Sequence, residues 1–114
     1  MLKVYFKPNC ATCQTALALI KRNTEDELDL IEYLVDTPTA VEIKEILKML
    51  GMEAEDLVRK KEPLYKEKYE GKKISEEKWI DIMVKNPILI ERPILVKDGK
   101  AIIGRPIEKI LDFL

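Results

Sequence analysis

The amino-terminal part of the chain switches between two hydrophobic periods. From Leu2 to Lys7 apolar residues alternate with charged or polar ones, and Pro8 follows. A period of two that stops at a proline predicts a β-strand. From Ala11 to Asn23 the apolar residues recur at helical spacing, which predicts a helix directly after that strand. The next apolar run, Leu28 to Leu34, predicts a second strand.

The middle of the chain has the pattern of a helical segment. Thr39 followed three residues later by Glu42 is the signature of a capping box, and Gly51 is a typical stop for the helix that it begins. Ser75 has the character of an N-cap for a further helix. Between these two helices we expect a short helix from Glu55 to Lys60 and a solvated loop or irregular helix from Lys61 to Lys73.

The carboxy-terminal part returns to strands. Two apolar runs, Pro93 to Val96 and Ala101 to Ile103, flank a segment that contains Asp98-Gly99. An Asp-Gly pair between apolar runs predicts a tight β-hairpin. Pro106 suits the first position of a final amphipathic helix.

The order of these elements predicts a thioredoxin-like α/β (α+β) fold. A β-α-β unit is followed by a helical insert, at about residues 39–85, and then by a β-β-α unit. A right-handed crossover makes the first two strands parallel, so the four-stranded sheet should be mixed. The sheet and the helices together should form three layers. A chain of 114 residues has the usual length of one domain, and we expect residues 1–114 to form a single domain.

Composition narrows the possible functions. Lys and Arg total 20 against 21 Asp and Glu, a balance that favours neither nucleic acid nor an acidic membrane as partner. No apolar run approaches the roughly 20 residues of a membrane span, and no signal-peptide pattern is present, so we expect a cytoplasmic protein. The chain has no histidine, which removes most zinc sites and every Cys-His pair. We therefore expect no metal.

Two cysteines stand at the predicted junction between the first strand and the first helix. A thiolate at Cys10 would face the unpaired N–H groups and the positive end of the helix dipole, which lower a thiol pKa. Cys13, about one turn later, could attack a mixed disulfide on Cys10 as a resolving thiol. The alternative is that both are small apolar core residues, as buried cysteines often are.

Three arginines lie at boundaries between predicted elements. Arg59 ends a helical segment, Arg92 precedes Pro93, and Arg105 precedes Pro106. Guanidinium groups present forks of donors that match tetrahedral oxyanions, so three of them around a thiolate would form an anion site. Taken singly, each could equally be a solvated surface charge.

Four segments carry a resemblance to a known family: Asn9 to Cys13, Leu57 to Pro63, Asn86 to Ile94 and Gly104 to Pro106. In order and spacing they resemble the ArsC family of glutaredoxin-coupled arsenate reductases. The resemblance covers nearly the whole chain.

This resemblance implies roles for individual residues. Cys10 would attack arsenate, and Arg59, Arg92 and Arg105 would hold the oxyanion. Glutathione, as a co-substrate rather than a bound cofactor, would complete the reduction together with glutaredoxin. The resemblance also implies a cis peptide bond before Pro93. We expect the protein to act as a monomer.

Some positions differ from the family pattern and leave alternatives open. Phe6 stands where the family usually has a histidine, and Cys13 and Gln14 stand where a serine and an arginine are typical. With Cys13 present, a Cys10–Cys13 disulfide reducible by thioredoxin or glutaredoxin is an alternative to a glutathione adduct. The motif is also similar to that of Spx-type regulators, which sense oxidation and bind RNA polymerase, although Arg105 argues against this reading. A general thiol-disulfide reductase is the third hypothesis.

Overall fold

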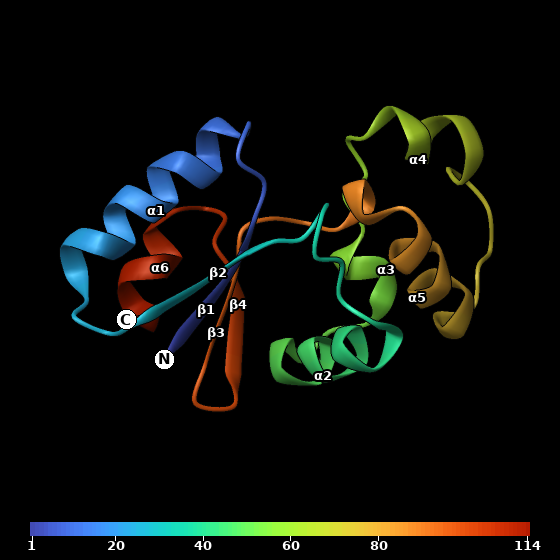
Figure 1. Cartoon of the computed structure of the whole chain (residues 1–114). Helices are drawn as coiled ribbons and strands as arrows, with labels where there is room; N and C mark the ends of the chain where they lie inside the picture. Colours follow the sequence, from blue (N-terminus) through green and yellow to red (C-terminus); the bar gives the residue numbers. More distant parts are fainter. The chain divides into compact units, whose positions relative to one another are not determined.

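A four-stranded sheet is central to the computed structural model, which describes residues 1–114 (Figure 1). The sheet has the order β2-β1-β3-β4, in which β1 and β2 are parallel and the other two pairs are antiparallel. The predicted mixed sheet with a parallel first pair is confirmed. The strands are β1 (Leu2–Phe6), β2 (Leu28–Glu32), β3 (Ile94–Lys97) and β4 (Lys100–Ile103).

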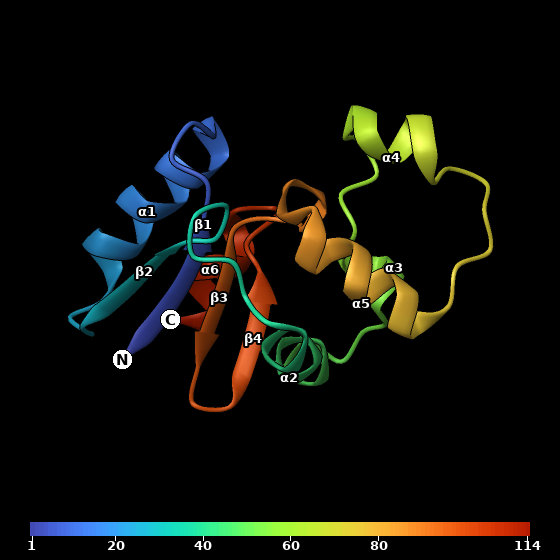
Figure 2. The same ribbon diagram turned by 45° about the vertical axis from the view of Figure 1, so that its right-hand side comes forward.

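The chain forms two compact units. One consists of Met1–Asp36 and Arg92–Leu114, and the other of Thr37–Glu91. The first contains the sheet together with α1 (Ala11–Asn23) and α6 (Glu108–Phe113). Figures 1 and 2 both show α1 and α6 side by side on one face of this sheet.

Apolar side chains from the sheet and its two helices form the core of the first unit. Alternate residues of β1 are directed toward α1, so the apolar positions of this strand pack against the apolar face of the helix that follows it. The buried cluster stabilises the junction between β1 and α1, where the cysteines lie. Its members are Leu2, Val4, Ala16, Leu17, Ile20, Leu95 and Ile110.

The carboxy-terminal helix begins later than predicted. We expected Pro106 at its first position, but α6 starts at Glu108. The N–H groups of Lys109 and Ile110 donate to the carbonyls of Pro106 and Ile107, which are the three-residue steps of a tight turn rather than α-helical bonds. The hairpin prediction is confirmed, since β3 and β4 are antiparallel neighbours in the sheet.

The second unit contains the helical segment. Its elements are α2 (Ala40–Leu50), α3 (Ala54–Leu57), α4 (Pro63–Lys68), α5 (Glu76–Lys85) and the 3₁₀ helix η1 (Pro87–Leu89). The predicted capping box is confirmed, with Thr39 accepting from the N–H of Glu42 and the Glu42 side chain accepting from the N–H of Thr39. Ser75 caps α5 as predicted. The short helix expected at Glu55 to Lys60 starts earlier and ends earlier, as α3. No helix of the protein combines the length and the hydropathy that crossing a bilayer requires.

Candidate functional site

The strand register brings several chain segments to one end of the sheet, where β1 and β2 finish. Parallel β1 and β2 end together, since Phe6 is paired with Glu32. Antiparallel β3 starts at this end of the sheet, where Ile94 is paired with Tyr5. Strand β4 finishes there, where Ile103 is paired with Ile94. Residues just outside the four strands therefore meet here. They are Cys10 after β1, Tyr33 after β2, Arg92 before β3 and Arg105 after β4.

Cys10 lies at the strand-to-helix junction, as the sequence pattern predicts, and is the N-cap of α1. Its carbonyl accepts from the N–H of Gln14 at 3.0 Å, and its own N–H donates to the carbonyl of Lys7 at 3.2 Å. The backbone at Cys10 is thus fixed between the turn after β1 and the first turn of the helix. Both cysteines are reduced, Cys10 partly exposed and Cys13 fully buried.

The two thiols differ in acidity. Burial raises the pKa of Cys10, but hydrogen bonds from the backbone N–H and the thiol of Cys13, and the Arg92 guanidinium, outweigh it and lower this pKa from 9.0 to about 7. Burial raises the pKa of Cys13 to about 11, although the Lys7 backbone acts in the opposite direction. Near neutral pH, Cys10 is therefore substantially a thiolate, and Cys13 remains a thiol.

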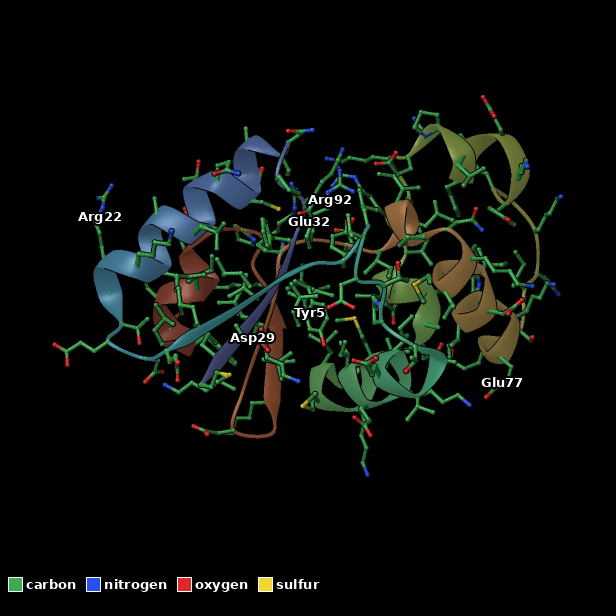
Figure 3. The ribbon with its side chains drawn as sticks, viewed as in Figure 1. Tyr5, Arg22, Asp29, Glu32, Glu77 and Arg92 are labelled. Atoms are coloured by element: carbon green, nitrogen blue, oxygen red, sulfur yellow. The ribbon has the colours of Figure 1, made fainter.

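Two of the three predicted arginines lie beside Cys10. Nη2 of Arg105 is 3.5 Å from the Cys10 sulfur, and its Nε donates to the carbonyl oxygen of Arg92 at 2.5 Å. The Arg92 side chain is buried, and its guanidinium lowers the pKa of Cys10. Arg92, which precedes β3, and Glu32, which ends β2, are both labelled in Figure 3. The peptide bond between Arg92 and Pro93 is cis.

Arg59 belongs to the helical unit and has acidic partners there. Its Nε donates to the Glu62 carboxylate at 3.1 Å, and its Nη1 lies 4.0 Å from the Glu91 carboxylate. Its backbone N–H donates to the carbonyl of Leu89 at 2.6 Å, next to the bridge between Val58 and Ile90. Arg59 is thus anchored by two carboxylates.

Sequence analysis did not single out Tyr33. We treated it as part of an apolar run, whereas β2 ends at Glu32 and Tyr33 follows it. Its hydroxyl accepts from Nη1 of Arg92 at 3.5 Å, and its side chain is buried. No local pattern marked it, because the residues that follow two parallel strands can be matched only once the register is known. The pairing of Phe6 with Glu32 places Tyr33 beside the turn that leads to Cys10.

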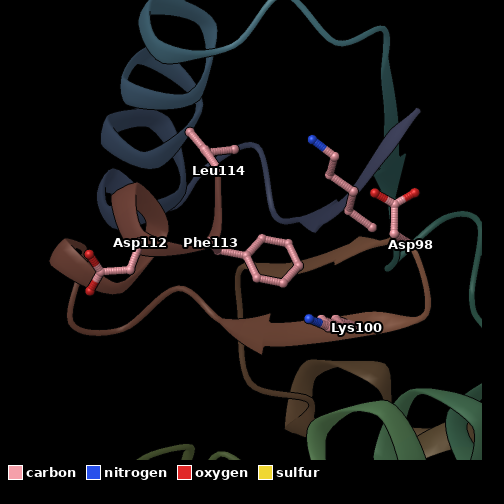
Figure 4. A pocket seen from close by; sticks show the side chains of 6 residues that line it. Asp98, Lys100, Asp112, Phe113 and Leu114 are labelled. Atoms are coloured by element: carbon pink, nitrogen blue, oxygen red, sulfur yellow. The ribbon is translucent and has the colours of Figure 1, made fainter.

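A hollow lies at the opposite end of the same sheet from the thiol site (Figure 4). The pairing of Lys3 with Val96 puts the carboxyl end of β3 beside the start of β1, away from the end of β1 that leads to Cys10. This hollow, of about 330 Å³, is therefore separate from the thiol site. It is lined by Lys97, Asp98, Lys100, Asp112, Phe113 and Leu114.

The sequence resemblance implied a nucleophilic cysteine with three arginines, of which Arg92 and Arg105 lie beside Cys10 at the helix N-terminus. The comparison with known families tests the resemblance itself. The model of the ArsC family matches residues 5–113. The chain belongs to the ArsC family. Its relatives include the Escherichia coli K12 protein YfgD, described as uncharacterized, which is 43% identical over 99% of this chain and 96% of that protein. An arsenate reductase of Acidiphilium multivorum is 34% identical over 99% of this chain and 80% of its own length.

Solved structures of the ArsC family show the same fold. An arsenate reductase from Vibrio cholerae superposes with a TM-score of 0.92 at 36% identity, covering 99% of this chain and 97% of that chain. The predicted family membership and the thioredoxin-like α/β fold are therefore confirmed.

Proposed function

We propose that this ArsC protein is an arsenate reductase-like thiol oxidoreductase in which Cys10 attacks an arsenate-type oxyanion. The observation that carries the proposal is the contact of 3.5 Å between Nη2 of Arg105 and the sulfur of Cys10, whose pKa is lowered to about 7. A nucleophilic sulfur and a cationic hydrogen-bond donor thus lie next to each other. Relatives that are named arsenate reductase support the choice of substrate.

The oxyanion would be bound by guanidinium forks and by the start of α1. Arg92 and Arg105 supply donors beside the sulfur, and a guanidinium can hold two oxygens of a tetrahedral anion at once. The first N–H groups of α1, a helix of 13 residues, add positive potential. Arg59 matches the family's third arginine and is proposed as a further ligand, for which it would exchange part of its contact with Glu62.

The first chemical step forms a bond without changing any oxidation state. The Cys10 thiolate donates an electron pair to As(V), and one arsenate oxygen leaves as water after taking up protons. A covalent S–As adduct results. Arg92 and Arg105 would stabilise the negative charge on the remaining oxygens, because donors fixed in a partly desolvated site need no rearrangement during the reaction.

Reduction takes place in the second step. A thiol attacks the Cys10 sulfur, a disulfide bond forms, and the electron pair of the S–As bond passes to arsenic, which leaves as As(III). Two thiols have then lost two electrons in total. We propose Cys13 as the attacking thiol, because it lies about one turn along α1 from Cys10, with glutathione as the alternative. Thioredoxin or glutaredoxin would restore the dithiol.

The test is turnover with a coupled reductant. Arsenate-dependent oxidation of NADPH is expected with glutathione, glutaredoxin and glutathione reductase, or with a thioredoxin system. Cys10→Ser should abolish it. Arg92→Ala and Arg59→Ala should each lower kcat/KM, whereas Arg22→Ala, on the part of α1 far from Arg92 in Figure 3, should not. Absence of turnover in both systems at high arsenate would exclude the proposal.

The position of Cys13 about one turn along α1 from Cys10 also favours a second function, general thiol-disulfide exchange. Such a reductase needs the two thiols and no oxyanion ligand. It predicts reduction of disulfide substrates that persists in the Arg59→Ala/Arg92→Ala double variant. An arsenate reductase should instead lose most of its activity in that variant.

A further inference from the structure

We propose that Tyr33 is a positioning residue whose hydroxyl fixes the Arg92 guanidinium against the Cys10 sulfur. The part of this inference that concerns oxyanion binding rests on the proposed function. The part that concerns the reactivity of the Cys10 thiol does not depend on it.

The first argument is the placement of Tyr33. It follows β2 directly, and the pairing of Phe6 with Glu32 puts it level with the turn that leads to Cys10. Its side chain is 1% exposed and that of Arg92 is 4% exposed. Two side chains so buried keep a defined geometry, which a solvated pair would not.

The second argument is the set of contacts along Arg92. Its carbonyl accepts from Arg105, whose Nη2 lies 3.5 Å from the Cys10 sulfur, and its own Nη1 donates to the Tyr33 hydroxyl at 3.5 Å. An arginine side chain has several rotatable bonds, and its alignment with a small target depends on fixed acceptors. Tyr33 supplies such an acceptor on the guanidinium itself.

The third argument is the chemistry of that acceptor. A phenol hydroxyl orients a guanidinium without cancelling its charge, whereas a carboxylate does both. Arg59 shows the other arrangement in the same chain, with Glu62 at 3.1 Å. The Tyr33 hydroxyl therefore orients the Arg92 guanidinium without itself neutralising the positive charge of that group. A tyrosine suits this position better than an acid would.

The test compares Tyr33→Phe with the unmodified protein by pH-dependent alkylation of Cys10. Removing one oxygen should raise the pH midpoint of alkylation and slow alkylation below that midpoint by about threefold, since Arg92 loses its alignment. The KM for arsenate should rise about fivefold, with a smaller effect on kcat. Alkylation needs no turnover. An inactive protein whose alkylation still responds to Tyr33→Phe would therefore refute the proposed function and support this inference.

A double-mutant cycle separates positioning from packing. In an Arg92→Ala background, Tyr33→Phe should leave the alkylation profile unchanged, because its effect passes through Arg92. Tyr65→Phe is the matched control: this tyrosine stacks on Trp79 in the helical unit, and its loss should leave Cys10 unaffected. Should Tyr33→Phe fail to fold, Tyr33→Met removes the same oxygen with an adaptable apolar chain.

Three outcomes would overturn the inference. The first is an unchanged alkylation midpoint in a folded Tyr33 variant. The second is an equal effect with and without Arg92. The third is a lower midpoint, which would mean that Tyr33 draws Arg92 away from the sulfur.

Discussion

Arg105 is anchored by the backbone of Arg92. Its Nε donates to the Arg92 carbonyl at 2.5 Å, while Nη2 of the same planar group lies 3.5 Å from the Cys10 sulfur. One guanidinium therefore spans a fixed acceptor and the reactive atom. An ammonium group, which is a compact point charge, cannot reproduce this double contact.

Arg105→Lys should therefore weaken anion binding although it keeps the charge. We expect the arsenate concentration that half-protects Cys10 from alkylation to rise about tenfold, as befits the loss of a charge-assisted hydrogen bond. Titrating protection at constant ionic strength measures this concentration. Arg22→Lys, on the same helix as Cys10, is the control and should leave it unchanged. Equal protection in both variants would argue against an anchoring role for the guanidinium plane.

The lowered pKa of Cys10 predicts its reactivity with pH. Because the thiolate is the nucleophile, alkylation of Cys10 should rise with pH, reach half its maximal rate near pH 7, and fall about tenfold per unit below that. Cys13, with a pKa raised to about 11, should stay unmodified throughout this range. Arg92→Ala should move the Cys10 midpoint upward, since it removes a positive charge and a donor. Mass spectrometry of timed samples resolves the two sites. A midpoint near 8.5, the value of an ordinary free thiol, would contradict the proposed activation.

Gly104 allows the chain to pass closely between the hairpin and α6 on its way to Arg105. A Cβ there would lie 3.0 Å from Cγ of Pro93 and 3.1 Å from Cδ1 of Ile110. Gly104→Ala should therefore destabilise the protein by about 1–3 kcal/mol, the usual result of overpacking. Thermal unfolding followed by circular dichroism measures this.

A second substitution identifies the cause of that loss. Ile110→Val removes the Cδ1 methyl that a new Cβ would meet, so the Gly104→Ala/Ile110→Val variant should be more stable than the sum of the single effects allows. Simple additivity would mean that this close contact is not the source of the destabilisation.

The fold could be predicted from local patterns because each element has its own signal. The alternation before Pro8 and the capping box at Thr39 both appear in the structure as expected. The start of α6 was wrong because Pro106 is equally suited to the turn that precedes a helix. A local rule does not distinguish the two.

The site was only partly predictable, since it depends on strand register. Cys10 could be placed at the junction between the first strand and the first helix. Its contact with Arg105 joins residues far apart in the sequence: the position of Arg105 at an element boundary left that contact open, and the family resemblance implied it. Tyr33 was missed because a buried tyrosine after a strand resembles any core residue until the pairing of β1 with β2 is known.

Substitutions of Thr39 test the stability of the helical unit, independently of the thiol site. Its hydroxyl accepts from the N–H of Glu42 at 3.2 Å, and the Glu42 carboxylate accepts in return at 3.1 Å. Thr39→Ala should lower the free energy of unfolding by about 1 kcal/mol, and Thr39→Ser should nearly preserve it. Trp79, the single tryptophan of the chain, lies in this unit and reports its denaturation by fluorescence. Equal stability of the two variants would show that the cap contributes nothing.

Cys13→Ser distinguishes the two electron routes. A serine hydroxyl keeps a donor near Cys10 but cannot form a disulfide, so turnover supported by thioredoxin should fall by more than about tenfold if Cys13 resolves the adduct. Turnover with glutathione and glutaredoxin should persist, because an external thiol can still attack the Cys10 sulfur. A single-turnover reaction without reductant gives the matching stoichiometry. The unmodified dithiol should lose both thiols and release As(III), whereas Cys13→Ser should lose only Cys10 and retain arsenic on the protein. Equal release of As(III) from both proteins would show that Cys13 is not the thiol that attacks the adduct.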